Sequence, residues 1–390
     1  MQGFETLNQP VYITALASFL PNEPVGNDEM EELLGRVHQL PSKTRRIILR
    51  NNGIRQRYYA IDRETGATTH SNAQLTAEAV RRLRPEEGLE PSQIECLCCG
   101  TSSPDQLMPG HASMVHGELG GAPCEILSAS GICGAGMSAM KYAWLSVASG
   151  QSRRAVATGS ELASSYMRAR FCGGIDPGKA EQLEQQPVLS FEADFLRWML
   201  SDGAGAALLS DRPNPSHLSL RIEWIEQLSY AHELEPCMYA GADKLADGSL
   251  RGWRENPDLK KLAFTETMLV KQDVKLLKAQ IINVAVDKAL RKIAAKQHLK
   301  ASEVDWFLPH YSSEFFRPKL KARMDEIGFS VPEERWFTNL PYKGNTGSAS
   351  IYIILEELFY SGKVKKGEKL LCFIPESGRF CMWYMLVNVC

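Results

Sequence analysis

The sequence predicts an α/β fold made of two similar halves. Short apolar segments alternate with longer helical patterns along most of the chain, and this alternation is typical of the α/β class. The chain also repeats itself, because Ala79–Ser103 aligns without a gap with Ala289–Ser313. Two copies of a domain-sized repeat indicate a duplicated domain. We therefore expect two pseudo-symmetric halves over residues 1–210 and 211–390.

Apolar residues at helical spacing mark the helices of the first half, and short apolar runs bounded by turn residues mark its strands. The helix that begins near Cys133 is rich in small residues and ends at Gly150, since glycine commonly follows a helix C-terminus. The expected elements are, in order, a helical stretch at 28–50, a helix at 73–83, a strand at 94–100, a helix at 109–119, a strand at 125–128, a helix at 133–149, and strands at 154–158 and 205–210.

The second half repeats this scheme of helices and strands. Its expected elements are a helix at 268–296, a strand at 306–309, helices at 314–327 and 347–360, and strands at 369–374 and 381–389. Two stretches, 168–196 and 211–258, are richer in glycine, proline and charge. We expect them to be long loops that cap an active site, which is a common role of such loops.

Composition limits the classes of function. The 390 residues are 44% hydrophobic, enough for large cores, and carry a net charge of −2, which favours neither a nucleic-acid nor a membrane-surface partner. The first residues lack a signal-peptide pattern, and no run of about twenty apolar residues occurs. We therefore expect a cytoplasmic protein with reduced thiols. The cluster Cys96, Cys98 and Cys99 fits a buried strand, so no metal and no cofactor are expected.

Cys133 lies where a strand is expected to turn sharply into a helix. It follows the run SASGI and precedes GAG. At a helix N-terminus, unpaired N–H groups stabilise a thiolate and lower the pKa of the thiol, and they can hold an oxyanion on a thioester carbonyl. Cys133 is therefore a candidate nucleophile. The local sequence also fits a buried, inert cysteine in a helix of small residues.

His310 and Asn345 occupy related places in the second half. His310 follows the strand at 306–309, and α/β folds place functional groups at the carboxyl ends of strands. Asn345 lies in the run KGNTGSA, a tight turn that opens a helix. In the alignment of the two halves, Asn345 occupies the position equivalent to Cys133. Alone, each residue also fits a structural role, as a buried histidine or an N-cap. Together, a cysteine, a histidine and an asparagine are a catalytic arrangement.

Six segments in order resemble the motifs of ketoacyl-ACP synthase III enzymes, and the resemblance covers nearly the whole chain. It implies the thiolase fold, with five αβαβα layers, and a homodimer. The six segments are Asn52–Arg57, the small-residue setting of Cys133, Gly159–Glu161, Ser201–Ala207, Leu308–His310 and Gly344–Ser350.

The resemblance also implies roles for particular residues. Cys133 would take an acyl group, while His310 and Asn345 would assist decarboxylation and stabilise the enolate of the second substrate. The backbone of Cys133 and Gly378 would form the oxyanion hole. The implied partners are acyl thioesters on acyl carrier protein or on coenzyme A.

Two departures from the family pattern bear on which substrates the resemblance implies. The glycine triplet near the C-terminus appears here as Glu376–Phe380, and Ile47 replaces a tryptophan that stacks on coenzyme A, which favours a carrier-bound donor. The ending PESGRF and the chain length resemble bacterial ketosynthases that make 2,5-dialkylcyclohexane-1,3-diones, precursors of dialkylresorcinols and isopropylstilbene. Those enzymes join a β-ketoacyl thioester to an α,β-unsaturated acyl thioester by Claisen condensation and Michael addition, closing a ring.

Further candidates surround this site. Glu376 and Arg379 are expected near the oxyanion hole as additional acid or base groups. Glu161 is a third such group, although it equally fits a packed residue at a strand end. Met108 and Phe171 are expected to line the substrate tunnel.

Basic residues follow His310 on one expected helix. Arg317, Lys319 and Lys321 fit either a solvated face or the docking surface of an acidic carrier protein, and the resemblance favours docking.

The sequence therefore predicts an acyltransferase that forms carbon–carbon bonds and closes a cyclohexane-1,3-dione. The alternatives are a decarboxylative β-ketoacyl synthase III, an acyltransferase of the same fold, and a catalytically silent heterodimer partner. The presence of Cys133, His310 and Asn345 argues against a silent partner, since such partners lose the nucleophile.

Overall fold

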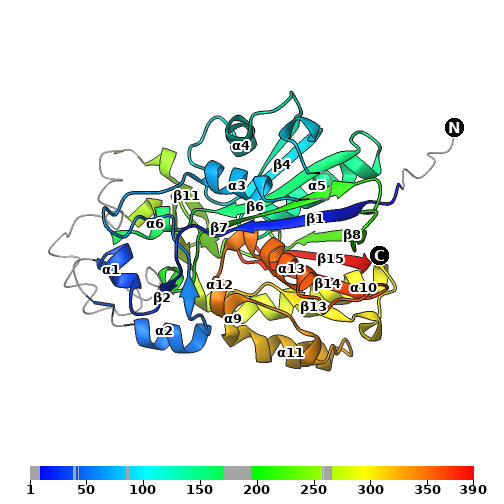
Figure 1. Ribbon diagram of the computed structural model, residues 1–390. Helices are drawn as coiled ribbons and strands as arrows, with labels where there is room; N and C mark the ends of the chain where they lie inside the picture. Colours follow the sequence, from blue (N-terminus) through cyan, green and yellow to red (C-terminus); the bar gives the residue numbers. More distant parts are fainter. Residues whose placement is uncertain are drawn as a thin grey trace.

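Nine strands form one mixed sheet in the computed structural model, which describes residues 9–37, 41–42, 44–84, 88–169, 195–256, 258 and 266–390. The strand order is β13-β14-β15-β8-β1-β7-β6-β4-β5 (Figure 1). Their bounds are β1 Tyr12–Phe19, β4 Cys96–Thr101, β5 Glu125–Ser130, β6 Arg154–Glu161, β7 Gly203–Ser210, β8 Leu220–Ser229, β13 Trp306–Pro309, β14 Lys369–Glu376 and β15 Cys381–Val389.

The sheet has two parts that meet between β1 and β8. These two strands pair only through Tyr12 with Arg221 and Ile13 with Leu220. On one side β4 is parallel to β5 and β6, and on the other β13 is parallel to β14, while the remaining pairs are antiparallel. Short strands make three further pairs: β2 Val25–Gly26 with β3 Gln56–Arg57, β9 Met238–Tyr239 with β12 Lys271–Gln272, and β10 Ala242–Lys244 with β11 Leu250–Gly252.

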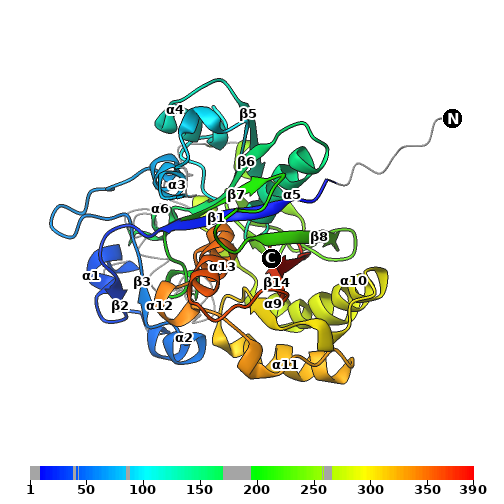
Figure 2. The same ribbon diagram turned by 45° about the vertical axis from the view of Figure 1, so that its right-hand side comes forward.

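Helices form three layers around the two parts of the sheet, as Figures 1 and 2 show. Helices α3 and α4 cover one outer face, α5 and α13 lie between the two parts of the sheet, and α9, α10 and α11 cover the other outer face. The helices are α1 Met30–Leu34, α2 Arg45–Asn52, α3 Asn72–Arg81, α4 His111–Leu119, α5 Ala135–Ala148, α6 Ser164–Met167, α9 Val274–Ile282, α10 Arg291–Lys296, α11 Arg317–Glu326, α12 Leu340–Lys343 and α13 Ser350–Tyr360.

Shorter helical turns complete the described chain. A π-helical segment, Asn283–Leu290, joins α9 to α10. The 3-10 turns are Pro91–Gln93, Trp253–Glu255, Glu266–Met268, Ala301–Glu303, Glu314–Phe316, Glu333–Arg335 and Gly347–Ala349. None of the helices within the described ranges is long and apolar enough to cross a membrane.

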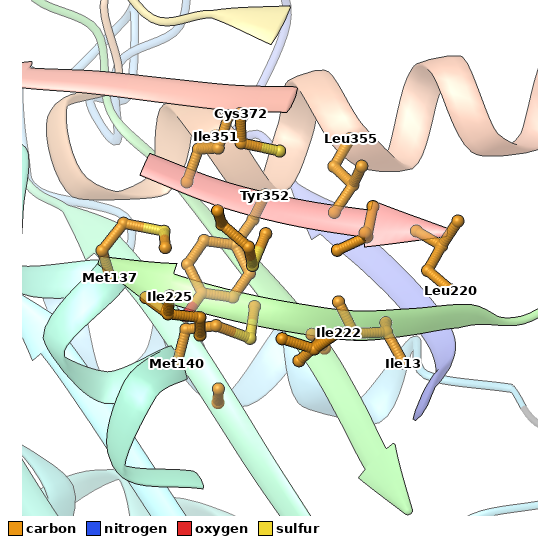
Figure 3. Close-up of a cluster of buried hydrophobic side chains, with 14 of the residues drawn as sticks. Ile13, Met137, Met140, Leu220, Ile222, Ile225, Ile351, Tyr352, Leu355 and Cys372 are labelled. Carbon is orange, nitrogen blue, oxygen red and sulfur yellow. The ribbon is translucent and has the colours of Figure 1, made fainter. Parts of the chain in front are cut away.

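The two central helices pack against the sheet through a shared apolar core. Met137 and Met140 of α5 and Ile351 of α13 belong to one cluster, together with Ile222 and Ile225 of β8 (Figure 3). This core buries both helices at the centre of the fold, so their N-terminal ends are held firmly relative to each other.

Glycines allow those ends to approach closely. A Cβ atom on Gly159 would lie 2.1 Å from the carbonyl oxygen of Ser348, and one on Gly136 would lie 2.3 Å from the same atom. Across the helices, the Tyr352 hydroxyl donates a hydrogen bond of 2.7 Å to the Gly136 carbonyl. Because the N-terminal ends of α5 and α13 meet here, the turns that carry Cys133 and Asn345 are brought to one region.

The structure differs from the sequence expectations in three places. The helical stretch at 28–50 is two helices, α1 and α2, and the helix expected from residue 268 begins at Val274. The stretch 211–258, predicted as a capping loop, contains β8 at the middle of the sheet, so the loop prediction was wrong for that part, while residues 238–240 do line the cavity described below. Its overall glycine and charge content hid the alternating strand pattern LRIEWIEQLS. Most of the other stretch, 168–196, lies outside the described residues.

Candidate active site

One cavity of about 330 Å³ is lined by Cys133, His310 and Asn345 together. Its remaining wall is mostly apolar and comes from two separate core clusters. One group includes Leu277, Ile281, Ala285, Leu320 and Phe373, and the other includes Ala163, Leu196, Leu200, Met238 and Val270. A few polar groups in a largely apolar cavity are typical of a site for a small molecule.

Cys133 lies in the turn between β5 and α5 and is 8% exposed. Burial raises the pKa of its thiol well above the usual range, and the nearby carboxyl groups of Glu376 and Glu161 raise it further. The expectation that the helix N-terminus would lower this pKa was therefore wrong. Removal from water and the two acidic neighbours outweigh the Cys133 backbone N–H, which lowers the pKa.

Glu376 occupies the helix end that was expected to act on the thiol. Its Oε2 atom accepts hydrogen bonds from the N–H of Gly134, at 2.8 Å, and from the N–H of Ile132, at 3.2 Å. The carboxyl group does not line the cavity, although Pro375 and Ser377 do. Burial raises its pKa, and the two N–H groups oppose that effect. The side chain therefore lies behind the Cys133 turn.

His310 follows β13, as expected, and is buried at the cavity wall. Its backbone N–H donates to the carbonyl of Phe373, at 2.8 Å, which fixes the residue against β14. Burial lowers the pKa of the imidazole to about 4, so the ring is neutral near pH 7. A neutral imidazole can donate one hydrogen bond and accept another.

Asn345 is held by three hydrogen bonds that leave its side-chain NH₂ group available. Its backbone N–H donates to Met199, its carbonyl accepts from Ser201, and its Oδ1 accepts from the N–H of Gly347 at 3.0 Å. Among the described residues, no acceptor pairs with Nδ2. The amide can therefore donate to an oxygen atom of a molecule in the cavity.

Glu161 is a buried member of the cavity wall, held by a cluster of serines. Its oxygens accept from the hydroxyls of Ser102, Ser103 and Ser348, at 2.5, 3.0 and 2.7 Å, and from the N–H of Ser348. Burial raises its pKa, and these donors oppose the rise. Because so many donors hold Glu161, its position fits an anchored group that joins the two halves better than a mobile base.

The other sequence candidates lie away from the cavity. Arg379 is exposed and donates from Nε to the carbonyl of Leu234, and Gly378 packs against Ile132 outside the cavity wall. Met108 is 81% exposed and does not line the cavity of the single chain. Phe171 lies outside the described residues. Within one described chain, the structure therefore gives no tunnel contact for Met108 and no catalytic contact for Arg379.

The basic helix α11 is largely neutralised by its own neighbours. Arg317 pairs with Glu333 at 3.0 Å, and Lys321 pairs with Asp325 at 2.5 Å. Lys319 is exposed, and its ammonium group lies 3.9 Å from the centre of the Phe315 ring. Only Lys319 of the three expected docking residues therefore presents a charge without a carboxylate partner among the described residues.

An entrance hollow, missed in the sequence, adjoins the cavity. It measures about 40 Å³ and shares Phe195 and Phe316 with the cavity wall. Lys278 lines it, and this lysine also lies over the Phe315 ring, 5.3 Å from its centre. No sequence spacing links Lys278 on α9 to Lys319 on α11, so only the packing of the two helices reveals the pair.

Comparisons with known proteins identify a related group. Residues 294–374, which include His310 and Asn345, match the family described as 3-oxoacyl-[acyl-carrier-protein (ACP)] synthase III C terminal. The chain is 24% identical to beta-ketoacyl-[acyl-carrier-protein] synthase III of Bordetella petrii. The match spans 359 residues, which are 92% of this chain and 92% of that protein.

Solved structures agree in fold. OleA of Xanthomonas campestris has a TM-score of 0.74 at 22% identity, over 98% of this chain and 99% of that chain. The tetronic acid condensing enzyme AbyA1 has a TM-score of 0.72 at 17% identity, over 97% of this chain and 99% of that chain. The expected thiolase-type α/β fold is confirmed, and the chain is similar to ketoacyl-ACP synthase III enzymes.

Proposed function

We propose that this protein is an acyltransferase that forms carbon–carbon bonds between acyl thioesters through an acyl group held on Cys133. The observation that carries the proposal is the single apolar cavity that Cys133, His310 and Asn345 line together. The similarity to ketoacyl-ACP synthase III proteins in sequence and fold supports it.

The residues divide the reaction into two steps. In the first, the Cys133 sulfur attacks the thioester carbonyl, the carbon–sulfur bond of the donor breaks, and the departing thiol carries the proton away. In the second, the other substrate loses a proton from the carbon next to its carbonyl, and the resulting enolate attacks the acyl carbon. The bond from that carbon to the Cys133 sulfur breaks, and the released sulfur takes up the proton. The neutral ring of His310 and Nδ2 of Asn345 donate hydrogen bonds to the enolate oxygen.

We further propose that both substrates carry apolar chains. The two apolar groups of the cavity wall, one from each core cluster, provide separate surfaces for them. OleA of Xanthomonas campestris has been solved with lauric acid and lauroyl-CoA bound, so this fold accommodates long acyl groups. The pair that we propose is a β-ketoacyl thioester and an α,β-unsaturated acyl thioester. A Claisen condensation and a Michael addition form the two carbon–carbon bonds of the ring, and hydrolysis of the remaining thioester with loss of CO2 leaves a cyclohexane-1,3-dione.

Product analysis tests this choice of substrates. Incubated with the two proposed thioesters, the protein is expected to release a cyclohexane-1,3-dione, detected by liquid chromatography and mass spectrometry. With malonyl carrier protein as the only nucleophile, little β-ketoacyl product is expected, because no lysine or arginine among the described residues lines the cavity as a partner for a malonyl carboxylate. Efficient malonyl condensation without a cyclic product would contradict the ring-forming assignment and leave a β-ketoacyl synthase III activity.

The proposed donor is an acyl group on an acidic carrier protein that docks beside the entrance hollow. Lys278 and Lys319 present their charges at this hollow, and Arg46 and Arg50 of α2 are exposed next to it. Figures 1 and 2 both show α2, α9 and α11 on the same side of the molecule. We therefore propose that the carrier protein docks on this positive rim, which extends beyond the expected docking surface on α11.

Charge reversal tests the docking surface. The double variant Lys278→Glu and Lys319→Glu is expected to raise KM for carrier-bound substrate about tenfold, with kcat little changed, because surface charge acts on encounter and not on chemistry. The matched control is Lys292→Glu, an exposed lysine of α10. Steady-state kinetics with a carrier thioester and a short thioester mimic give the comparison. Equal effects on the two substrates would place the carrier elsewhere.

We also propose a homodimer that forms at the β5 end of the sheet. β5 is the terminal strand, and exposed apolar side chains surround it, among them Met108, Ile126 and Leu145. Exposed strand edges and apolar patches are typical of protein interfaces. A second copy on this face would cover Met108.

A further inference from the structure

A carboxylate from the far end of the chain holds the turn that carries Cys133. Glu376 is the last residue of β14, and its Oε2 atom accepts from the N–H groups of Gly134 and Ile132. Gly134 is the N-cap residue of α5 and has no side chain with which to cap the helix. Glu376 therefore satisfies the N–H of this N-cap residue from another element.

Glu376 and Cys133 differ in their relation to the cavity. Glu376 binds the residues on either side of Cys133 and lies outside the cavity wall, whereas Cys133 lines it. Two N–H groups of the turn thus point to the carboxylate, and Cys133, the residue between them, lines the cavity.

Space at this turn is limited. A Cβ atom on Gly134 would lie 2.6 Å from Oε2 of Glu376 and 2.4 Å from Nε1 of Trp383. On the neighbouring strand end, a Cβ atom on Gly378 would lie 2.8 Å from Cδ1 of Ile132. The glycines in the runs CGAG and ESGRF therefore allow the carboxylate and the turn to meet.

We propose that Glu376 is a positioning residue, which directs the backbone N–H and the thiol of Cys133 into the cavity and places a negative charge behind the sulfur. The inference rests on the proposed role of Cys133 as nucleophile. It replaces the expectation that Glu376 acts on the substrate as an acid or base, because the carboxyl group does not reach the cavity wall.

The charge has a consequence for reactivity. The ionisable groups that act on the thiol are Glu376 and Glu161, both of which raise its pKa, and the third neighbour in the cavity, His310, is neutral near pH 7. Burial, which is the largest cause, and these two carboxyl groups therefore favour the thiol form of Cys133. Since the thiolate is the form that reacts with oxidants and alkylating agents, the resting enzyme is protected from both.

Alkylation of Cys133 across a pH series tests this inference. Rates with iodoacetamide are measured from pH 6 to 10 for wild type and Glu376→Gln, and peptide mass spectrometry assigns the modified cysteine. Glutamine keeps an oxygen for the two N–H groups and removes the charge. The rate profile is expected to move about one unit to lower pH, so that Cys133 reacts about tenfold faster at pH 8.

The control is Glu356→Gln, which removes another half-buried carboxylate that accepts a backbone N–H, from Ser18 at 3.1 Å, on α13. Its profile is expected to match wild type. An unchanged profile in folded Glu376→Gln would overturn the inference and leave the proposed function intact. Failure of wild-type Cys133 to take an acyl group from any thioester would instead contradict the proposed function.

A second variant covers the case in which Glu376→Gln does not fold. Glu376→Asp keeps the charge and withdraws the carboxylate by one methylene group, so its hold on Gly134 weakens. Acyl transfer from a thioester to Cys133 is expected to slow about tenfold, while the alkylation profile stays near that of wild type. Acyl transfer at the wild-type rate would show that the turn needs no cap from Glu376 and would overturn the inference.

Discussion

Cys133→Ala is expected to abolish the covalent acyl adduct and all product formation. Among the described residues, Cys133 is the only cysteine that lines the cavity, so no other thiol is placed to take the acyl group. Intact-protein mass spectrometry after incubation with acyl thioesters measures the adduct as a mass increase. The substitution removes one sulfur atom from a buried site and costs roughly 1 kcal/mol of stability, so the protein stays folded.

The matched control for this experiment is Cys124→Ala. Cys124 is a half-buried free cysteine outside the cavity wall, and its replacement is expected to leave the adduct unchanged. Circular dichroism and thermal unfolding show whether each variant is folded. An adduct of full intensity on Cys133→Ala would exclude this residue as the nucleophile.

His310→Ala and Asn345→Ala are expected to separate the two steps of the reaction. Both variants keep Cys133 and should still form the acyl adduct. Each loses one hydrogen-bond donor to the enolate oxygen, which typically costs about a hundredfold to a thousandfold in kcat. Single-turnover experiments measure adduct formation by mass spectrometry and condensation product by chromatography in the same samples.

A control histidine tests whether the loss is specific to the cavity. His232 is exposed and lies outside the cavity wall, so His232→Ala is expected to condense at the wild-type rate. Condensation by His310→Ala or Asn345→Ala at an undiminished rate would remove that residue from the second step. Loss of the adduct in a folded variant would instead assign it to the first step.

Much of the site could be predicted because its signals are local. A strand, a tight turn rich in small residues and a helix surround Cys133, and a similar turn and helix follow Asn345. His310 follows the strand at 306–309 in the sequence and in the structure. The internal repeat added the one long-range relation that a sequence can show directly.

The partners of the basic residues were harder to predict, because these partners lie at different distances along the chain. Lys321 pairs with Asp325 at a spacing of four residues, which a helical pattern could have indicated. Arg317 pairs with Glu333 of a separate turn, and Lys278 and Lys319 meet over one ring from two helices. These contacts depend on helix packing, so the sequence could not show which basic residues of α11 have carboxylate partners.

The sequence by itself determined the α/β class, the order of most elements and the residue types at the turns. Each of these depends on residues that are close to one another along the chain. Only the tertiary structure decided the direction in which the pKa of Cys133 shifts and the position of Glu376. These residues are far apart in sequence, and their hydrogen bonds form because β14 ends behind the α5 N-terminus. Burial and charge at that point come from the whole fold, which is why the local helix end did not set the pKa of the thiol.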